Sequence, residues 1–192
     1  MNFLICYLVT FFVIKLGADA IEVQCEYKLG FNTGYTAEYT CDVKSVKILS
    51  SDDCELTSVT GAHKPGKTND DVTIFFSFIK TFNCFPKITK FFKNIDAVLI
   101  YAAKITTIDK SDLQQFGSKL TYLHVGYNKL EVIDSDLFDY TPNIGMFFVN
   151  GNQIKYVGSG AFGKLQKLSW LYFNPNPCNS GAAGDITSGV AT

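Results

Sequence analysis

Histidine and cysteine are the residues in this sequence best suited to chemistry, and they form no catalytic pattern. The two histidines are His63, in a polar stretch, and His124, among apolar residues. Neither has the His-Glu-x-x-His spacing of a zinc protease, and no Gly-x-Ser-x-Gly elbow supplies a nucleophile. Carboxylates such as Asp134 and Asp136 are interpreted as solvated turn residues. We therefore expect no enzyme, with no catalytic residue, no metal and no cofactor.

Residues 1–20 have the composition of a secretory signal peptide. An apolar run from Phe3 to Ile14 ends at Lys15, and small residues at Ala18 and Ala20 suit cleavage. A membrane anchor is the alternative, but the run is too short to span a bilayer comfortably. No later apolar segment is long enough for stable membrane insertion. The sequence therefore predicts a secreted, extracellular protein.

Secretion places the cysteines that follow residue 20 in an oxidising compartment, where cysteines form disulfides. The most economical pairing joins Cys25 to Cys41 and Cys54 to Cys84, and pairing of Cys41 with Cys54 stays open. Cys178 is then the odd thiol. It links two chains, pairs with a cysteine of a longer natural chain, or is an inert, half-buried cysteine.

The charge pattern argues against nucleic-acid binding. The net charge is -1, and all 17 basic residues are lysines. A nucleic-acid binder needs a basic surface, and arginine is the side chain that best recognises phosphates and base edges. We expect no nucleic-acid partner.

The most informative stretch is Leu120–Leu130, which has the pattern L-x-x-L-x-L-x-x-N-x-L. The same apolar slots recur in repeats that begin at Ile95, Ile144 and Leu168. Successive starts are 25, 24 and 24 residues apart, from the positions 95, 120, 144 and 168. This period is typical of leucine-rich repeats.

Asparagines recur in the same slot of three repeats: Asn128, Asn152 and Asn176. Their amides are expected to bond backbone groups that lose their partners where each strand ends. The second repeat has Ala103 in this slot, so it lacks the asparagine.

The segments before these repeats are less regular. Residues 21–71 contain alternating β-type runs and a polar connection, which predicts a disulfide-tied N-terminal β cap. Residues 72–178 hold about five repeats, the last partial, and residues 179–192 form a flexible tail. The first repeat is degenerate and its register ambiguous. Its apolar positions include Val72, Ile74, Phe76, Ile79, Phe82 and Phe85.

The repeats resemble the extracellular leucine-rich repeat family. The cap CEYK…YTCDVKSVKI and the sequence FPKITKFFKN before the second repeat make the chain similar to small secreted leucine-rich repeat proteins of insects. This resemblance covers roughly Cys25 to Cys178. It implies a curved solenoid with a parallel β-sheet on its concave face and short helical or irregular segments on its convex side. Innate immunity, adhesion or signalling are contexts implied by the resemblance alone.

Residues between the apolar slots should point to the concave face, where they form columns. One column runs Ala97, Tyr122, Met146, Trp170, and the next runs Leu99, His124, Phe148, Tyr172. A third begins with Tyr101. The residues expected to bind a partner are Tyr101, Tyr122, His124, Tyr127, Met146, Phe148, Trp170 and Tyr172. The alternative is that these rings only pack against one another or lie under the N-terminal segment.

The sequence thus favours a secreted, non-enzymatic recognition protein that binds an extracellular protein through its concave face. One alternative is an assembly module that forms a homodimer through its uncapped C-terminal repeat or Cys178. A third hypothesis is a carrier that holds an apolar small molecule against the aromatic columns.

Overall fold

The computed structural model describes residues 21–30, 38–49 and 54–178. Within them, one sheet of eight strands has the spatial order β10-β8-β6-β5-β4-β2-β1-β3. The predicted signal peptide, residues 1–20, and the predicted tail, residues 179–192, lie outside the described residues. The strands of the sheet are β1 Ile21–Leu29, β2 Tyr39–Ile48, β3 Leu56–Thr60, β4 Val72–Phe78, β5 Ala97–Tyr101, β6 Tyr122–His124, β8 Met146–Phe148 and β10 Trp170–Tyr172.

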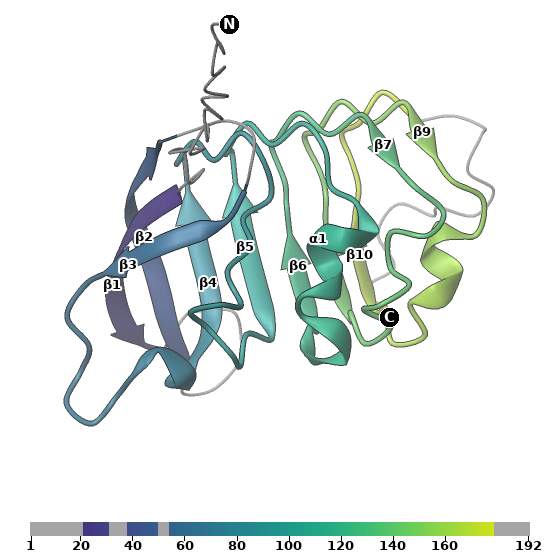
Figure 1. Ribbon diagram of the computed structural model, residues 1–192. Coiled ribbons are helices and arrows are strands. Elements are labelled where there is room, and N and C mark those ends of the chain that lie inside the picture. Colours follow the sequence, from purple (N-terminus) through teal and green to yellow (C-terminus); the bar gives the residue numbers. More distant parts are fainter. Residues whose placement is uncertain (1–20, 31–37, 50–53, 179–192) are drawn as a thin grey trace, which may run out of the picture.

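From β4 onward, each repeat contributes one strand to this sheet, and neighbouring strands are parallel. The chain returns between strands on the opposite side of the core, as Figure 1 shows for helix α1 (Lys110–Gln114). The other short elements of the described part are β7 Val132–Ile133, β9 Tyr156–Val157 and the 3₁₀ helices η1 Asn69–Asp71, η2 Gly117–Lys119 and η3 Ala161–Lys164. This architecture confirms the predicted curved solenoid.

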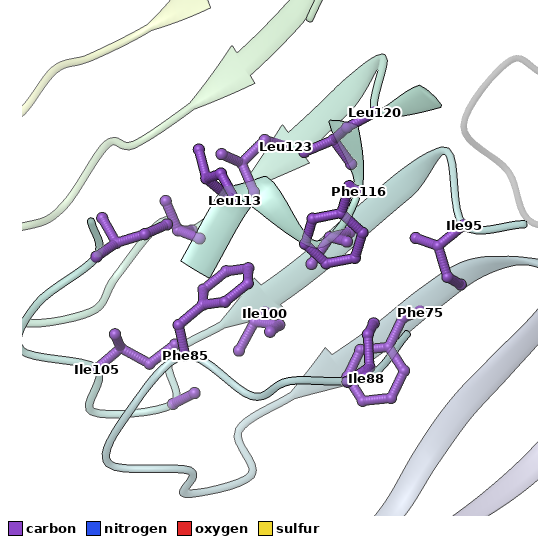
Figure 2. Packing of buried hydrophobic residues seen from close by; sticks show 14 of the residues in the cluster. Phe75, Phe85, Ile88, Ile95, Ile100, Ile105, Leu113, Phe116, Leu120 and Leu123 are labelled. Carbon is purple, nitrogen blue, oxygen red and sulfur yellow. The ribbon is translucent and has the colours of Figure 1, made fainter. Parts of the chain in front are cut away.

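A continuous apolar core fills the space between the sheet and the returning segments. Parallel pairing places Val98 beside Leu123, and Leu123 beside Phe147, so one core slot recurs from strand to strand. Figure 2 shows Leu113, from helix α1, and Phe116 packed over the strands of Ile100 and Leu123. A single repeat has too little apolar surface to bury alone, so stacking of repeats supplies the core.

The asparagines form a ladder along the turns that follow the strands. Asn128 Oδ1 accepts the backbone N–H groups of Ala103 (2.9 Å) and Ile105 (3.1 Å) from the preceding repeat. Its Nδ2 donates to the carbonyls of Ile100, Val125 and Gly126. Asn152 and Asn176 likewise accept an N–H from the repeat before them, from Leu130 and Ile154 respectively. The buried turns therefore have partners for their backbone groups.

The N-terminal segment forms the β cap expected from the sequence. Strands β1 and β2 are antiparallel, and β2 pairs in parallel with β4 of the first repeat. Disulfides join Cys25 to Cys41 and Cys54 to Cys84, the pairing favoured above. The first bond links β1 to β2, and the second ties the cap to the first repeat. The main-chain bond from Lys87 N–H to the Cys54 carbonyl (2.8 Å) reinforces this tie.

The register of the first repeat differs from the apolar pattern suggested above. Phe75 pairs with Val98 and Ser77 with Ile100, so Phe75 and Ser77 occupy the core slots. Ile74 and Phe76 point instead to the concave face, because successive side chains of a strand alternate between faces. Ile79 is exposed in the following turn, whereas Val72, Phe82 and Phe85 belong to the core.

Candidate binding surface on the concave face

Strand pairing aligns the predicted columns on the concave face. Ala97 pairs with Tyr122, Tyr122 with Met146 and Met146 with Trp170. In the second column, Leu99 pairs with His124, His124 with Phe148 and Phe148 with Tyr172, in the same register. Both columns continue toward the cap, where Ile74 precedes Ala97 and Phe76 precedes Leu99. The sheet thus places aromatic side chains side by side across several repeats.

Exposure of the columns changes along the solenoid. Ile74, Ala97, Leu99 and Tyr122 form a second apolar cluster, and only 9% of Tyr122 is exposed. Tyr122 therefore offers little accessible surface. At the other end, Trp170 and Tyr172 are 50% and 52% exposed. Met146 and Phe148 lie between these extremes. The accessible part of the face is centred on β8 and β10.

The rings of the face touch one another in sequence. Phe148 stacks with Tyr122 (centroids 5.4 Å apart) and with His124 (5.3 Å, planes 4° apart). Tyr172 lies 6.1 Å from Phe148 in a tilted arrangement. Tyr101 lies 5.4 Å from His124 and 4.8 Å from Tyr127. Ring pairs at these distances and angles stabilise one another.

His124 is held as a neutral imidazole among the rings of the face. Its Nδ1 accepts the backbone N–H of Gly126 at 3.1 Å, which leaves the proton of the neutral ring on Nε2. Burial lowers the pKa of His124 to about 4. At neutral pH the imidazole is therefore uncharged and lies between Tyr101 and Phe148.

Charged side chains lie where the concave face meets the N-terminal cap. Asp42, opposite Phe76 on β2, accepts hydrogen bonds from Lys28 Nζ (2.6 Å) and Lys44 Nζ (2.8 Å). Asp96 comes just before β5, and burial raises the pKa of its carboxyl group. The middle of the face is apolar, and its charged groups lie toward the cap.

Two exposed residues near the face, Phe78 and Ile79, were missed by the sequence reasoning. Phe78 ends β4 and stacks on Tyr101 with ring centroids 5.2 Å apart. The ambiguous register of the first repeat hid both residues. The sequence did contain the correct register. Its core positions Val72, Phe75, Ser77 and Phe82 have the same spacing as those of the repeat that begins at Leu120.

His63, the other histidine, lies in the cap and not on this face. Its ring stacks on Tyr27 at 3.8 Å, and its Nδ1 is 3.1 Å from the Tyr39 hydroxyl. Its Nε2 is 3.0 Å from Asn69 Oδ1, an acceptor, so Nε2 donates and Nδ1 accepts from Tyr39. His63 therefore joins the polar connection to the cap.

The rest of the described part adds no chemical centre to this surface. Across residues 21–30, 38–49 and 54–178, no three or more His, Cys, Asp or Glu side chains are grouped as metal ligands. In the same residues, no helix has the length and apolar character needed to cross a bilayer. An open groove of about 680 Å³ lies outside the aromatic columns. It is lined by residues such as Thr107, Asp109 and Glu131.

Solved structures resemble this chain at low sequence identity. No curated protein sequence matches the chain. A chain of the Toll–Spatzle complex of Drosophila is 15% identical with a TM-score of 0.47, over 62% of this chain and 17% of that one. A chain of the TLR13–ssRNA13 complex is 19% identical with a TM-score of 0.45, over 56% and 18%. An internalin, inlF of Listeria monocytogenes, is 19% identical with a TM-score of 0.39, over 55% and 36%.

This chain therefore spans between 17% and 36% of the length of those three structures. Residues 118–177, which carry β6, β8 and β10, match the family model described as leucine rich repeat. The parallel sheet, the asparagine ladder and the disulfide-tied cap give the chain the fold of a leucine-rich repeat solenoid, and the matched residues belong to its repeats.

Proposed function

We propose that this chain is an extracellular, non-enzymatic recognition protein that binds a protein partner through the β8–β10 part of its concave face. The observation that carries the proposal is the run of aligned aromatic side chains ending in exposed Trp170 and Tyr172. Exposed, contiguous aromatic surface is costly in water, and tryptophan and tyrosine are the residues that most often anchor protein interfaces. The disulfides suit an oxidising extracellular compartment.

The test compares capture of extracellular proteins by wild type and by the variant Trp170→Ser/Tyr172→Ser. A matched control, Tyr140→Ser/Tyr156→Ser, removes two exposed aromatic residues outside the columns. We expect the first variant to lose a partner that the wild type and the control retain. Equal recovery of every partner by all three proteins would contradict the proposal. Circular dichroism of each protein checks that the fold is intact.

A second candidate function, self-assembly, is supported by the terminal repeat. Leu123 and Phe147 are fully buried, whereas Leu171, in the same slot of β10, is only partly buried. Cys178 is free and partly exposed. A second copy that covered β10 would bury this surface. Gel filtration with and without reductant tests the idea, and a monomer in both conditions would contradict it.

A further inference from the structure

A second set of backbone hydrogen bonds joins neighbouring repeats on the flank of the solenoid, beyond the turns that follow the strands. Between the second and third repeats, the Lys129 N–H donates to the Ile105 carbonyl (2.8 Å). Between the third and fourth repeats, the equivalent bond runs from the Gln153 N–H to the Leu130 carbonyl (2.9 Å). The two pairs of repeats therefore begin their flank contact in the same way.

Beyond these bonds, only the third and fourth repeats remain paired. Their strands β7 and β9 lie side by side and are parallel (Figure 1), and the Gly158 N–H donates to the Ile133 carbonyl (2.7 Å). Ile108 holds the position of Ile133 in the second repeat, two residues after Thr106. In the described part of the chain, no backbone N–H group of the third repeat donates to Thr106 or Ile108. The second and third repeats therefore separate at this point.

A groove of about 680 Å³ lies where these two repeats separate. We name it the flank groove. It is lined by residues of both repeats, among them Thr106, Ile108, Asp109, Glu131, Val132 and Asp134.

Strand β7 presents an unpaired backbone edge to the flank groove. The carbonyls of Glu131 and Ile133 both accept N–H groups of the fourth repeat, from Lys155 (2.8 Å) and Gly158 (2.7 Å). Because successive peptide groups of a strand point to opposite sides, the N–H and carbonyl of Val132 point away from β9. Within the described residues, β9 is the only strand that pairs with β7. An open strand edge of this kind is a template for an added strand.

The side chains around this edge are mainly acidic. Asp109, Glu131 and Asp134 line the groove together with one lysine, Lys129. Glu131 forms an ion pair with Lys155 at 3.1 Å. Asp134 is exposed and forms no ion pair with a residue that the structure describes. Carboxylates therefore outnumber amines at the open edge of β7.

We infer that the flank groove binds an extended, positively charged segment of a partner protein, which adds a strand to the open edge of β7. The backbone of that segment would exchange hydrogen bonds with the N–H and carbonyl of Val132. Its lysine or arginine side chains would meet the carboxylates of Asp109 and Asp134, and an apolar side chain would cover Val132, which is 41% exposed. The flank groove lies outside the aromatic columns, so the inference does not depend on binding by the concave face.

The probe is a short fluorescent peptide that alternates valine with lysine. One counterpart has glutamate in place of lysine, and another has N-methyl groups on its backbone, which remove the donors that strand pairing requires. Fluorescence anisotropy measures binding to the whole chain. We expect the lysine peptide to bind and the glutamate peptide to fail, because glutamate repels the carboxylates of the groove. The N-methylated peptide should bind roughly tenfold more weakly or worse.

Two pairs of variants locate the bound probe. Asp134→Lys should weaken binding roughly tenfold or more, since an attraction becomes a repulsion. Its control, Asp70→Lys, makes the same charge change at an exposed residue of η1 and should leave binding intact. Val132→Pro removes the N–H that faces the groove and should lose binding, whereas Val132→Ala keeps this N–H and should bind. Both Val132 variants should retain their melting temperature, because that N–H makes no bond to β9.

The inference is overturned if the glutamate or the N-methylated peptide binds as well as the lysine peptide, if Asp134→Lys and Asp70→Lys behave alike, or if none of the peptides binds. The N-methylated peptide tests strand pairing even where Val132→Pro fails to fold. Trp170→Ser/Tyr172→Ser should bind the lysine peptide as the wild type does. Loss of the peptide in that variant would place the probe on the concave face and refute the inference, while the proposed function is tested separately by capture of its partner.

Discussion

The ring of Tyr127 lies directly against the α-carbon of Gly151 in the next repeat. A β-carbon built on Gly151 would be 2.9 Å from Cδ1 of Tyr127, closer than such atoms approach in real structures. Two features therefore favour glycine at position 151: the positive φ of 68° and the Tyr127 ring against its α-carbon. The left-handed turn after β8 and the aromatic surface meet at this pair.

The first prediction concerns this contact. Gly151→Ala should destabilise the fold by about 1–3 kcal/mol, because it adds both a steric clash and left-handed strain. Urea denaturation measures the change. Gly163→Ala is the control, since its β-carbon would meet nothing within 4 Å. Similar stability losses in the two variants would show that the Tyr127 contact is not what restricts position 151.

The asparagine ladder leads to a second prediction. Asn128→Ala removes the acceptor for two buried N–H groups, those of Ala103 and Ile105, and should cost about 2–5 kcal/mol. Asn143→Ala is a suitable control, because its single bond to the Ser118 carbonyl is exposed. Thermal unfolding of both variants checks the difference. A melting curve of Asn128→Ala that matches wild type would refute the structural role of the ladder.

The cap disulfide allows a third prediction. Cys54 and Cys84 are separated by 30 residues, so replacing both with serine should cost about 3–4 kcal/mol through the added freedom of the unfolded chain. Cys178→Ser serves as the control because that thiol is free. Denaturant midpoints under non-reducing conditions provide the measurement. A double variant as stable as Cys178→Ser would mean that the bond does not secure the cap.

The fourth prediction is a pH dependence caused by His124. Its pKa is about 4 in the folded chain and near 6.5 when unfolded, so the unfolded state binds more protons between these values. Stability should therefore fall as the pH drops through this window, by about 2 kcal/mol at pH 5.

Comparison of wild type with His124→Gln isolates this effect from the carboxylates, which titrate in both proteins. The wild type should lose more stability between pH 7 and pH 5 than the variant. Parallel pH curves for the two proteins would rule out a depressed pKa for the partly buried His124. Nuclear magnetic resonance titration of the imidazole gives an independent value of its pKa.

Sequence reasoning was most informative where a pattern recurred. The repeat starts at Ile95, Leu120, Ile144 and Leu168 predicted the parallel alignment of β5, β6, β8 and β10, because each period returns the chain to the next strand. The pairs Cys25–Cys41 and Cys54–Cys84 were the most economical pairing by spacing, with Cys41–Cys54 left open, and the structure shows these two bonds. Such features are local or periodic, so they depend little on the rest of the fold.

The tertiary structure decided which side chains of the first repeat face the core. Residues Val72–Phe78 are apolar at both odd and even positions, and a shift of one residue exchanges the two faces of a strand. Pairing with β5 selected Phe75 for the core and left Phe78 exposed. Packing between strands also buried Tyr122 while leaving Trp170 and Tyr172 accessible, although all three occupy similar sequence slots. Repetition specifies the scaffold, whereas the binding surface depends on contacts between repeats.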